Sequence, residues 1–361
     1  FDCYLRLNVT DNDGLKNSTI RTIGIDNSAP RVNLDNPVNN SNTTSSTINF
    51  RHTATDVNLD TCILYHNETG TFKANETNTT VDSGIQDLIT INLLDGNFIW
   101  NVLCNDTESN QAFNATNFTL MVDTTPPKVE IERPLNNSWR IGNLTFYYNT
   151  TDYLNSVANC SLIINNKINQ TNYTITEDSS QNFTVNNFVD GNYNWSVNCS
   201  DALNNINNSV TWLIKLDTTR PNSTLDRPQN LTNISANSYL INATVVDSGI
   251  GVNVTVFEFR ENNAAGWQTA CTDKDGSDSY NCTWDLSSLS DGNQYQVRVR
   301  ANDSLGIFSE YDTHYNITID RIAPNVTILR PSNNTRDLDG DILFEYNITD
   351  ITSNIVNCSL V

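Results

Sequence analysis

The sequence of 361 residues predicts an all-β fold in which β-sandwich domains follow one another as beads on an extended rod. Three observations support this prediction: a proline motif that recurs about every hundred residues, strict alternation of apolar and polar side chains, and cysteines at corresponding places in different repeats. We find no segment with the apolar spacing of an amphipathic helix.

The recurring motif reads IDNSAP at 25–30, VDTTPP at 122–127, LDTTRP at 216–221 and IDRIAP at 319–324. Proline fixes φ and lacks an N–H donor, so each copy predicts a short, stiff connector between domains. An alternative interpretation is that the proline only ends the last strand of the preceding domain, and the sequence motif fits both. The predicted domains are 26–122, 123–216 and 217–319, with the C-terminal part of one sandwich at 1–25 and the N-terminal part of another at 320–361.

Within each repeat the side chains alternate with a period of two. The segments FIWNVLCND (98–106), YNWSVNCSD (193–201) and YQVRVRAND (295–303) each follow an Asp-Gly turn and predict half-buried antiparallel strands. An earlier strand in each repeat ends at Asp56, Asp152, Asp247 or Asp350, with inward pairs Phe50 and His52, Phe146 and Tyr148, Ile241 and Ala243, and Phe344 and Tyr346. Roughly seven such short strands make one sandwich.

The cysteines predict disulfides. Cys62 with Cys104 and Cys160 with Cys199 occupy matching places in two repeats, where the third repeat has Val254 and Ala301. Cys271 and Cys282 flank a short loop, which they would close as a hairpin, whereas Cys3 and Cys358 have no evident partner. The Cys and His spacing matches no zinc site, so the cysteines indicate an oxidising, extracellular location.

Charge and composition narrow the choice of partners. Twenty Lys and Arg against 41 Asp and Glu give a formal net charge of −21, which disfavours nucleic acid and anionic membrane surfaces. The sequence contains about 32 N-x-S/T sequons, an excess that predicts N-linked glycans, although Asn and Thr filling turns would create some by accident. The chosen glycosylation candidates are Asn39, Asn105, Asn136, Asn149, Asn194, Asn198, Asn230, Asn302, Asn333 and Asn347.

Metal binding and catalysis have weaker signals. Asp26, Asp123, Asp217 and Asp320 lie in the connectors, but one acid per connector favours a turn-forming role over calcium. Asp273, Asp275 and Asp278 are weak calcium candidates without the Glu of an EF-hand loop. His52, His66 and His314 have no nucleophile motif nearby, so we predict no catalytic residues, no enzyme, and no cofactor other than glycans.

The DTTPP junction, the strands carrying Trp100/Cys104/Asp106 and Trp195/Cys199/Asp201, and the NCSL strand resemble the tandem immunoglobulin-like repeats of microbial, especially archaeal, cell-surface proteins. The third repeat departs from this pattern because Val297 stands in place of the tryptophan. The resemblance implies a structural role in an extracellular filament, stalk or coat that serves adhesion. Its partners would be other copies of the chain and cell-surface glycans or proteins.

The alternative is a carbohydrate- or protein-binding adhesin module carried on a repeat stalk. Aromatic side chains stack on sugars, and Trp267 and Trp284, beside the third repeat's own cysteines, are the place for such a site. A core position is the preferred interpretation for both tryptophans.

Overall fold

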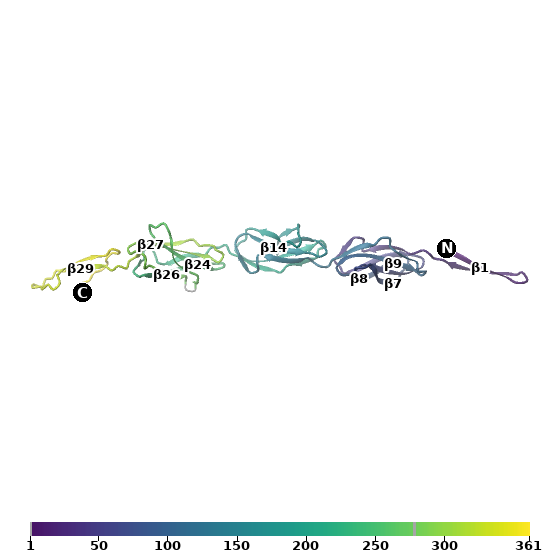
Figure 1. Ribbon diagram of the computed structural model, residues 1–361, viewed down its shortest axis with the longest axis horizontal. Helices are drawn as coiled ribbons and strands as arrows, with labels where there is room; N and C mark the ends of the chain where they lie inside the picture. The colour runs from purple at the N-terminus through teal and green to yellow at the C-terminus, as the bar shows by residue number, and fades with distance from the viewer. Residues whose placement is uncertain (1, 277–278) are drawn as a thin grey trace. The chain divides into compact units, whose positions relative to one another are not determined.

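The computed structural model describes residues 2–276 and 279–361, and it is all-β: this part of the chain contains no α-helix. Figure 1 shows successive bodies of strands, of which one contains β9 (Gly96–Asp106), one β14 (Leu144–Thr151) and one β24 (Val252–Glu261). Among the described residues, no helix is long and apolar enough to cross a membrane.

The first sandwich packs a 3-stranded sheet against a 6-stranded one. In the smaller sheet the strand order is β3 (Arg31–Asn36), β5 (Thr47–Thr55), β8 (Gln86–Asn92). The larger sheet has the order β4 (Ser41–Thr43), β11 (Phe118–Val122), β9, β6 (Leu59–His66), β7 (Lys73–Asn78), and β10 (Gln111–Phe113) also pairs with β9. All pairs are antiparallel except β4 with β11.

The second sandwich repeats this strand order. Its smaller sheet comprises β12 (Lys128–Arg133), β14 and β17 (Gln181–Val185). Its larger sheet comprises β13 (Ser138–Arg140), β20 (Trp212–Leu216), β18 (Gly191–Asp201), β15 (Val157–Ile164) and β16 (Lys167–Asn172), and β19 (Ile206–Asn208) pairs with β18.

The third sandwich has the same plan with a 5-stranded larger sheet. The smaller sheet is β21 (Asn222–Arg227), β23 (Ser238–Val246) and β26 (Asn281–Asp285); the larger is β22 (Asn233–Ile234), β28 (Asp312–Ile319), β27 (Gln294–Asp303), β24 and β25 (Gln268–Asp273). Each sandwich therefore contains more strands than the roughly seven expected, because short edge strands are added.

Two further segments form only two-stranded sheets: β1 (Asp2–Thr10) with β2 (Lys16–Gly24), and β29 (Asn325–Arg330) with β30 (Glu345–Thr349). Phe344 and Tyr346 were expected to face inward, but they are exposed because no second sheet covers them in this segment. The other predicted inward pairs, from Phe50 and His52 to Ile241 and Ala243, are fully buried.

A buried tryptophan lies at the centre of each sandwich. The rings of Phe50 and Trp100 meet edge to face at 4.8 Å, and Phe146 meets Trp195 in the same way at 4.9 Å. Where the third repeat has Val297 on the equivalent strand, Trp284 enters the core from β26 of the opposite sheet. The preferred core interpretation is therefore confirmed for Trp284.

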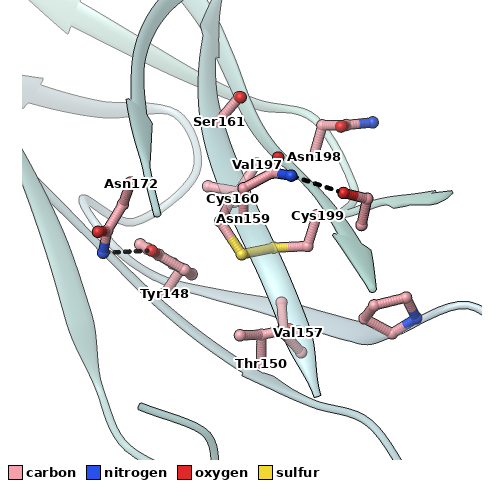
Figure 2. The surroundings of a disulfide bond; sticks show 12 residues. Tyr148, Thr150, Val157, Asn159, Cys160, Ser161, Asn172, Val197, Asn198 and Cys199 are labelled. Atoms are coloured by element: carbon pink, nitrogen blue, oxygen red, sulfur yellow. Dashed lines mark hydrogen bonds between the residues drawn. A yellow bond between two sulfur atoms is a disulfide. The ribbon is translucent and has the colours of Figure 1, made fainter. Parts of the chain in front are cut away.

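The disulfides Cys62–Cys104 and Cys160–Cys199 form as predicted. In both repeats the two cysteines are directly opposite each other on adjacent strands of the larger sheet. Figure 2 shows Cys160 and Cys199 joined in this way, with Tyr148 of the smaller sheet nearby. These bonds therefore staple neighbouring strands within one sheet.

Two predictions about the cysteine positions are wrong. In the third repeat the residue opposite Ala301 is Thr255, which is buried, whereas Val254 is opposite Asn302 and only half-buried. A bulge precedes Cys62, Cys160 and Thr255 at the same distance, so Thr255 is the residue that corresponds to the two cysteines. Cys271–Cys282 does form, but it closes no hairpin. Its cysteines lie on β25 and β26, which belong to different sheets, so this bond joins the two layers of the sandwich. Cys3 and Cys358 are exposed thiols.

Candidate functional site in the linker segments

The linker that follows the first sandwich is held by a turn aspartate of that sandwich. Asp95, just before β9, accepts hydrogen bonds from the Thr124 backbone N–H (3.0 Å), the Thr124 hydroxyl (2.8 Å) and the Thr125 hydroxyl. Burial alone would raise the pKa of Asp95, but these hydrogen bonds outweigh it and lower the pKa. The two threonines of the motif thus donate hydrogen bonds to the same carboxylate.

The next linker repeats the arrangement. Asp190 accepts hydrogen bonds from the Thr218 N–H (2.7 Å), the Thr218 hydroxyl (2.7 Å) and the Thr219 hydroxyl. The Thr219 hydroxyl is the main cause of a lowered pKa at Asp190. After the third sandwich Arg321 replaces the threonines: its N–H and Nε each donate to Asp291 at 2.9 Å, and its guanidinium reaches the carbonyl oxygens of Leu286 and Leu289.

Three of the four linker aspartates act as turn formers, as the sequence predicted, whereas Asp320 accepts a hydrogen bond from the Thr352 hydroxyl. Oδ1 of Asp26, Asp123 and Asp217 accepts the N–H two residues further along, at 3.0, 3.2 and 3.1 Å. A side-chain amide of the following sandwich also fastens two of these residues: Asn110 donates to the Asp26 carbonyl at 3.2 Å, and Asn205 to the Asp123 carbonyl at 2.9 Å.

The linker aspartates also meet other aspartates, which the sequence interpretation missed. Asp26 lies with Asp56 and Asp106, and carboxylate oxygens of the three fall within 4.8 Å of one another. Asp217, Asp247 and Asp303 form the same group in the third repeat. The sequence showed one acid per linker, but a second follows β5 or β23 and a third ends β9 or β27. We call each set of three an aspartate triad.

In the second repeat the corresponding residues are Asp123, Asp152 and Asp201. Burial raises the pKa of Asp123; the Thr125 N–H opposes this, and the nearby charges of Asp152, Asp201 and Asp95 add to it. A carboxylate whose neighbours are also carboxylates is costly to ionise without a cation.

The weak calcium candidates lie elsewhere. Asp273 accepts hydrogen bonds from the backbone N–H groups of Asp275 and Asn281, both at 2.8 Å, so its two oxygens already order the loop. Asp278 lies outside the described residues.

The glycosylation candidates fall into two groups. Asn39, Asn136 and Asn230 are exposed, and the Oδ1 of each accepts a backbone N–H from Thr119 (2.9 Å), Leu213 (2.9 Å) and Tyr315 (2.7 Å), respectively. Asn194, Asn333 and Asn347 are also exposed, whereas Asn105, Asn149, Asn198 and Asn302 are half-buried. Among the half-buried residues, the Asn198 amide nitrogen donates to Asn208 at 2.8 Å, and that of Asn105 donates to Asp60 and to a backbone carbonyl, both at 3.4 Å.

Trp267 and Trp284 do not form a surface pair. Trp284 is in the core, whereas Trp267 lies half-buried beneath the guanidinium groups of Arg260 and Arg298, at 4.6 and 4.0 Å from the ring centroid. Arg298 also covers Tyr311 at 3.7 Å. We call this set the arginine–aromatic cluster.

The histidines show no catalytic arrangement in the described part of the chain. His52 and His66 are buried, and Nδ1 of His314 lies 2.7 Å from the Pro228 carbonyl oxygen. Burial lowers the pKa of His52, so its ring stays neutral.

The strand order and paired sheets define a series of immunoglobulin-like β-sandwich repeats. No protein-family model and no curated protein matches the chain.

Similar solved structures include parts of two adhesion proteins and a set of fibronectin(III)-like modules. The tetra-tandem repeat in the extending region of a large adhesion protein is 17% identical, with 89% of this chain and 82% of that chain covered and a TM-score of 0.34. A 1.5-MDa bacterial ice-binding adhesin is 14% identical, with 82% and 99% covered and a TM-score of 0.35. The fibronectin(III)-like modules of Clostridium thermocellum CbhA are 15% identical, with 54% and 94% covered and a TM-score of 0.32.

Proposed function

We propose that the repeats form the structural part of an extracellular cell-surface filament, stalk or coat that serves adhesion and has no catalytic activity. The observation that carries this proposal is the way the linkers are held: Asp95, Asp190 and Asp291 each bind the linker that follows their own sandwich. Side chains devoted to fastening linkers suit a chain that transmits mechanical load. Disulfides between sheet strands and between sheets suit the same role and an oxidising location.

The partners in this proposal are other copies of the chain and glycans or proteins at the cell surface. Electron cryo-microscopy of native cell-surface material tests it. We expect continuous fibres or a regular coat whose density contains these sandwiches in series. Finding the chain only as single, unassembled molecules in the medium, or in an intracellular fraction, would overturn the proposal.

N-linked glycans are part of the same proposal. A glycan on asparagine replaces one amide hydrogen and leaves Oδ1 as an acceptor. Asn39, Asn136 and Asn230 can therefore be glycosylated without losing the hydrogen bonds described above. At Asn105 and Asn198 the amide nitrogen itself is a donor, so a glycan there would disturb a contact.

Glycopeptide mass spectrometry of native material distinguishes these two groups. We expect high occupancy at Asn39, Asn136 and Asn230 and lower occupancy at Asn105 and Asn198. Unmodified peptides at every sequon would exclude the glycan coat, and the reverse order of occupancy at these five positions would contradict the hydrogen-bond argument.

One observation favours the alternative function, an adhesin module that binds a carbohydrate or protein. On a chain of net charge −21, the arginine–aromatic cluster of the third sandwich gathers guanidinium groups over rings, with Tyr311 partly exposed. Such a surface suits an acidic sugar. A glycan array with the unmodified chain and an Arg298→Gln variant tests this function, which predicts binding to acidic glycans that the variant loses.

A further inference from the structure

The three aspartates of a triad occupy the same three structural positions in all three sandwiches. The first member lies in the linker, the second follows the strand β5, β14 or β23, and the third is the last residue of β9, β18 or β27. Residues distant in sequence thus supply carboxylates to one small region, within 4.8 Å for the first and third triads. Acidic residues scattered over the surface by chance would not recur at the same three positions in each sandwich.

The second and third triads contain buried carboxylate oxygens that lack a hydrogen-bond partner, whereas in the first triad both oxygens of Asp106 accept hydrogen bonds from Asn110. Asp123 is fully buried and its Oδ2 has no partner, and the same holds for Asp303 and its Oδ2. The other oxygen of Asp303 accepts the N–H groups of Leu305 and Ile307, both at 2.8 Å, which fixes the orientation of the free oxygen. Buried polar atoms in folded proteins normally have a partner, so these oxygens point to a ligand.

Positive side chains do not supply that partner. The ion pairs of Lys and Arg in the described part of the chain involve Asp291 and glutamates, and none includes a triad aspartate. A bound cation would supply the positive charge that no side chain brings to these carboxylates.

We propose that each aspartate triad binds a divalent cation, and that the donor set selects calcium. All the donors are hard carboxylate oxygens, and neither histidine nor a free thiolate is present in a triad, which disfavours zinc and other transition metals. Calcium accepts irregular sets of carboxylate and carbonyl oxygens, whereas magnesium keeps several waters and demands octahedral geometry.

The cation joins the linker to the sandwich that follows it. In the third repeat, Asp217 belongs to the linker, and Asp247 and Asp303 belong to that sandwich. Oδ2 of Asp217 also accepts the Ile250 N–H at 2.7 Å, and a Cβ on Gly249 would fall 1.7 Å from this oxygen. The Asp217 carboxylate thus occupies space that only a glycine at 249 leaves open, and calcium there would restrain the linker.

Calcium titration of the chelator-treated 361-residue chain tests the proposal, with calorimetry for affinity and native mass spectrometry for stoichiometry. We expect three bound calcium ions per chain and at least tenfold weaker binding of magnesium. Asp303→Asn should lose one ion and Asp285→Asn, an equal charge change at the exposed end of β26, should lose none. Hydrogen exchange at 217–219 and 247–251 should slow on addition of calcium, and this slowing should be absent in Asp303→Asn.

A second pair of variants separates ligand geometry from charge. Gly249→Ala keeps all three carboxylates but displaces Asp217, and it should also lose one ion; Gly266→Ala, whose Cβ would meet nothing within 4 Å, should bind all three. If Asp303→Asn does not fold, Asp56→Asn at the half-buried member of the first triad provides the same comparison. No binding at millimolar calcium, or three ions still bound in both Asp303→Asn and Gly249→Ala, would overturn the proposal.

Discussion

A disulfide can be installed in the third sandwich at the place where the other two have theirs. Thr255 and Ala301 are opposite each other on β24 and β27, as Cys62 and Cys104 are in the first sandwich. Thr255 is fully buried and its hydroxyl has no hydrogen-bond partner in the described structure. We therefore expect Thr255→Cys with Ala301→Cys to form a bond and to remove an unsatisfied polar atom.

The expected stabilisation follows from the loop that the bond closes. For a loop of about 46 residues the chain-entropy model gives about 4 kcal/mol at 25 °C, and because engineered bonds often give less, we expect about 2–4 kcal/mol. A change of that size in a domain of about a hundred residues corresponds to a melting temperature higher by roughly 10–25 °C.

The assay is peptide mapping under non-reducing conditions, followed by thermal unfolding with and without reductant. The matched control is Val254→Cys with Ala301→Cys, because residue 254 is opposite Asn302, not Ala301. We expect a bond and a reductant-sensitive rise in melting temperature only for the Thr255 pair. A bond in the Val254 pair and none in the Thr255 pair would refute the register described here.

Two other predictions concern a linker contact and the bond between sheets. Replacing Asp190 by Asn should destabilise the protein by about 1 kcal/mol at neutral pH, since it weakens the hydrogen bonds from Thr218 and Thr219. Because the folded-state pKa of Asp190 is lowered, its contribution is complete above the unfolded pKa and disappears as pH falls through the folded value. Unfolding in urea from pH 7 to pH 3 should show the difference from the Asn variant shrinking only below about pH 4, and a difference independent of pH would contradict this. Replacing Cys271 and Cys282 by Ser should cost about 2–3 kcal/mol for so short a loop, measured by urea unfolding; an unchanged midpoint would show that the bond adds nothing.

The strands and cores were predictable because their signal is local. Alternation around Trp100 and Trp195 reports which side chains face inward, and the structure buries both rings. That Thr255, and not Val254, corresponds to the cysteines was not predictable from alternation, because the loop before the strand varies in length. Thr255 follows Asp247 by eight residues, whereas Cys62 follows Asp56 by six. The role of Cys271–Cys282 was missed for a similar reason: neighbours along the chain can lie on strands of different sheets.

The aspartate triads are a second feature that local sequence patterns did not reveal. Asp217, Asp247 and Asp303 were each visible as a strand-end or linker acid, but only the fold brings their carboxylates within 4.8 Å. The signal that could have revealed them was the joint recurrence of all three positions in every repeat. A linear count of one acid per linker could not, because the second and third acids come from strands that start far from the linker.

The proline motif can now be explained residue by residue. Its aspartate turns the chain and joins the triad of the following sandwich, its two threonines bind the turn aspartate of the preceding one, and its proline prevents the linker from pairing with a strand. The last linker has Arg321 where the linkers at 122–127 and 216–221 have threonine, yet Arg321 reaches the corresponding aspartate, Asp291. Different side chains that reach the same contact indicate that the contact, and not the motif's composition, is what each repeat requires. The linkers at 122–127 and 216–221 are thus hydrogen-bonded to the sandwich on each side, by Asp95 and Asn205 in the first case and by Asp190 and Ile250 in the second.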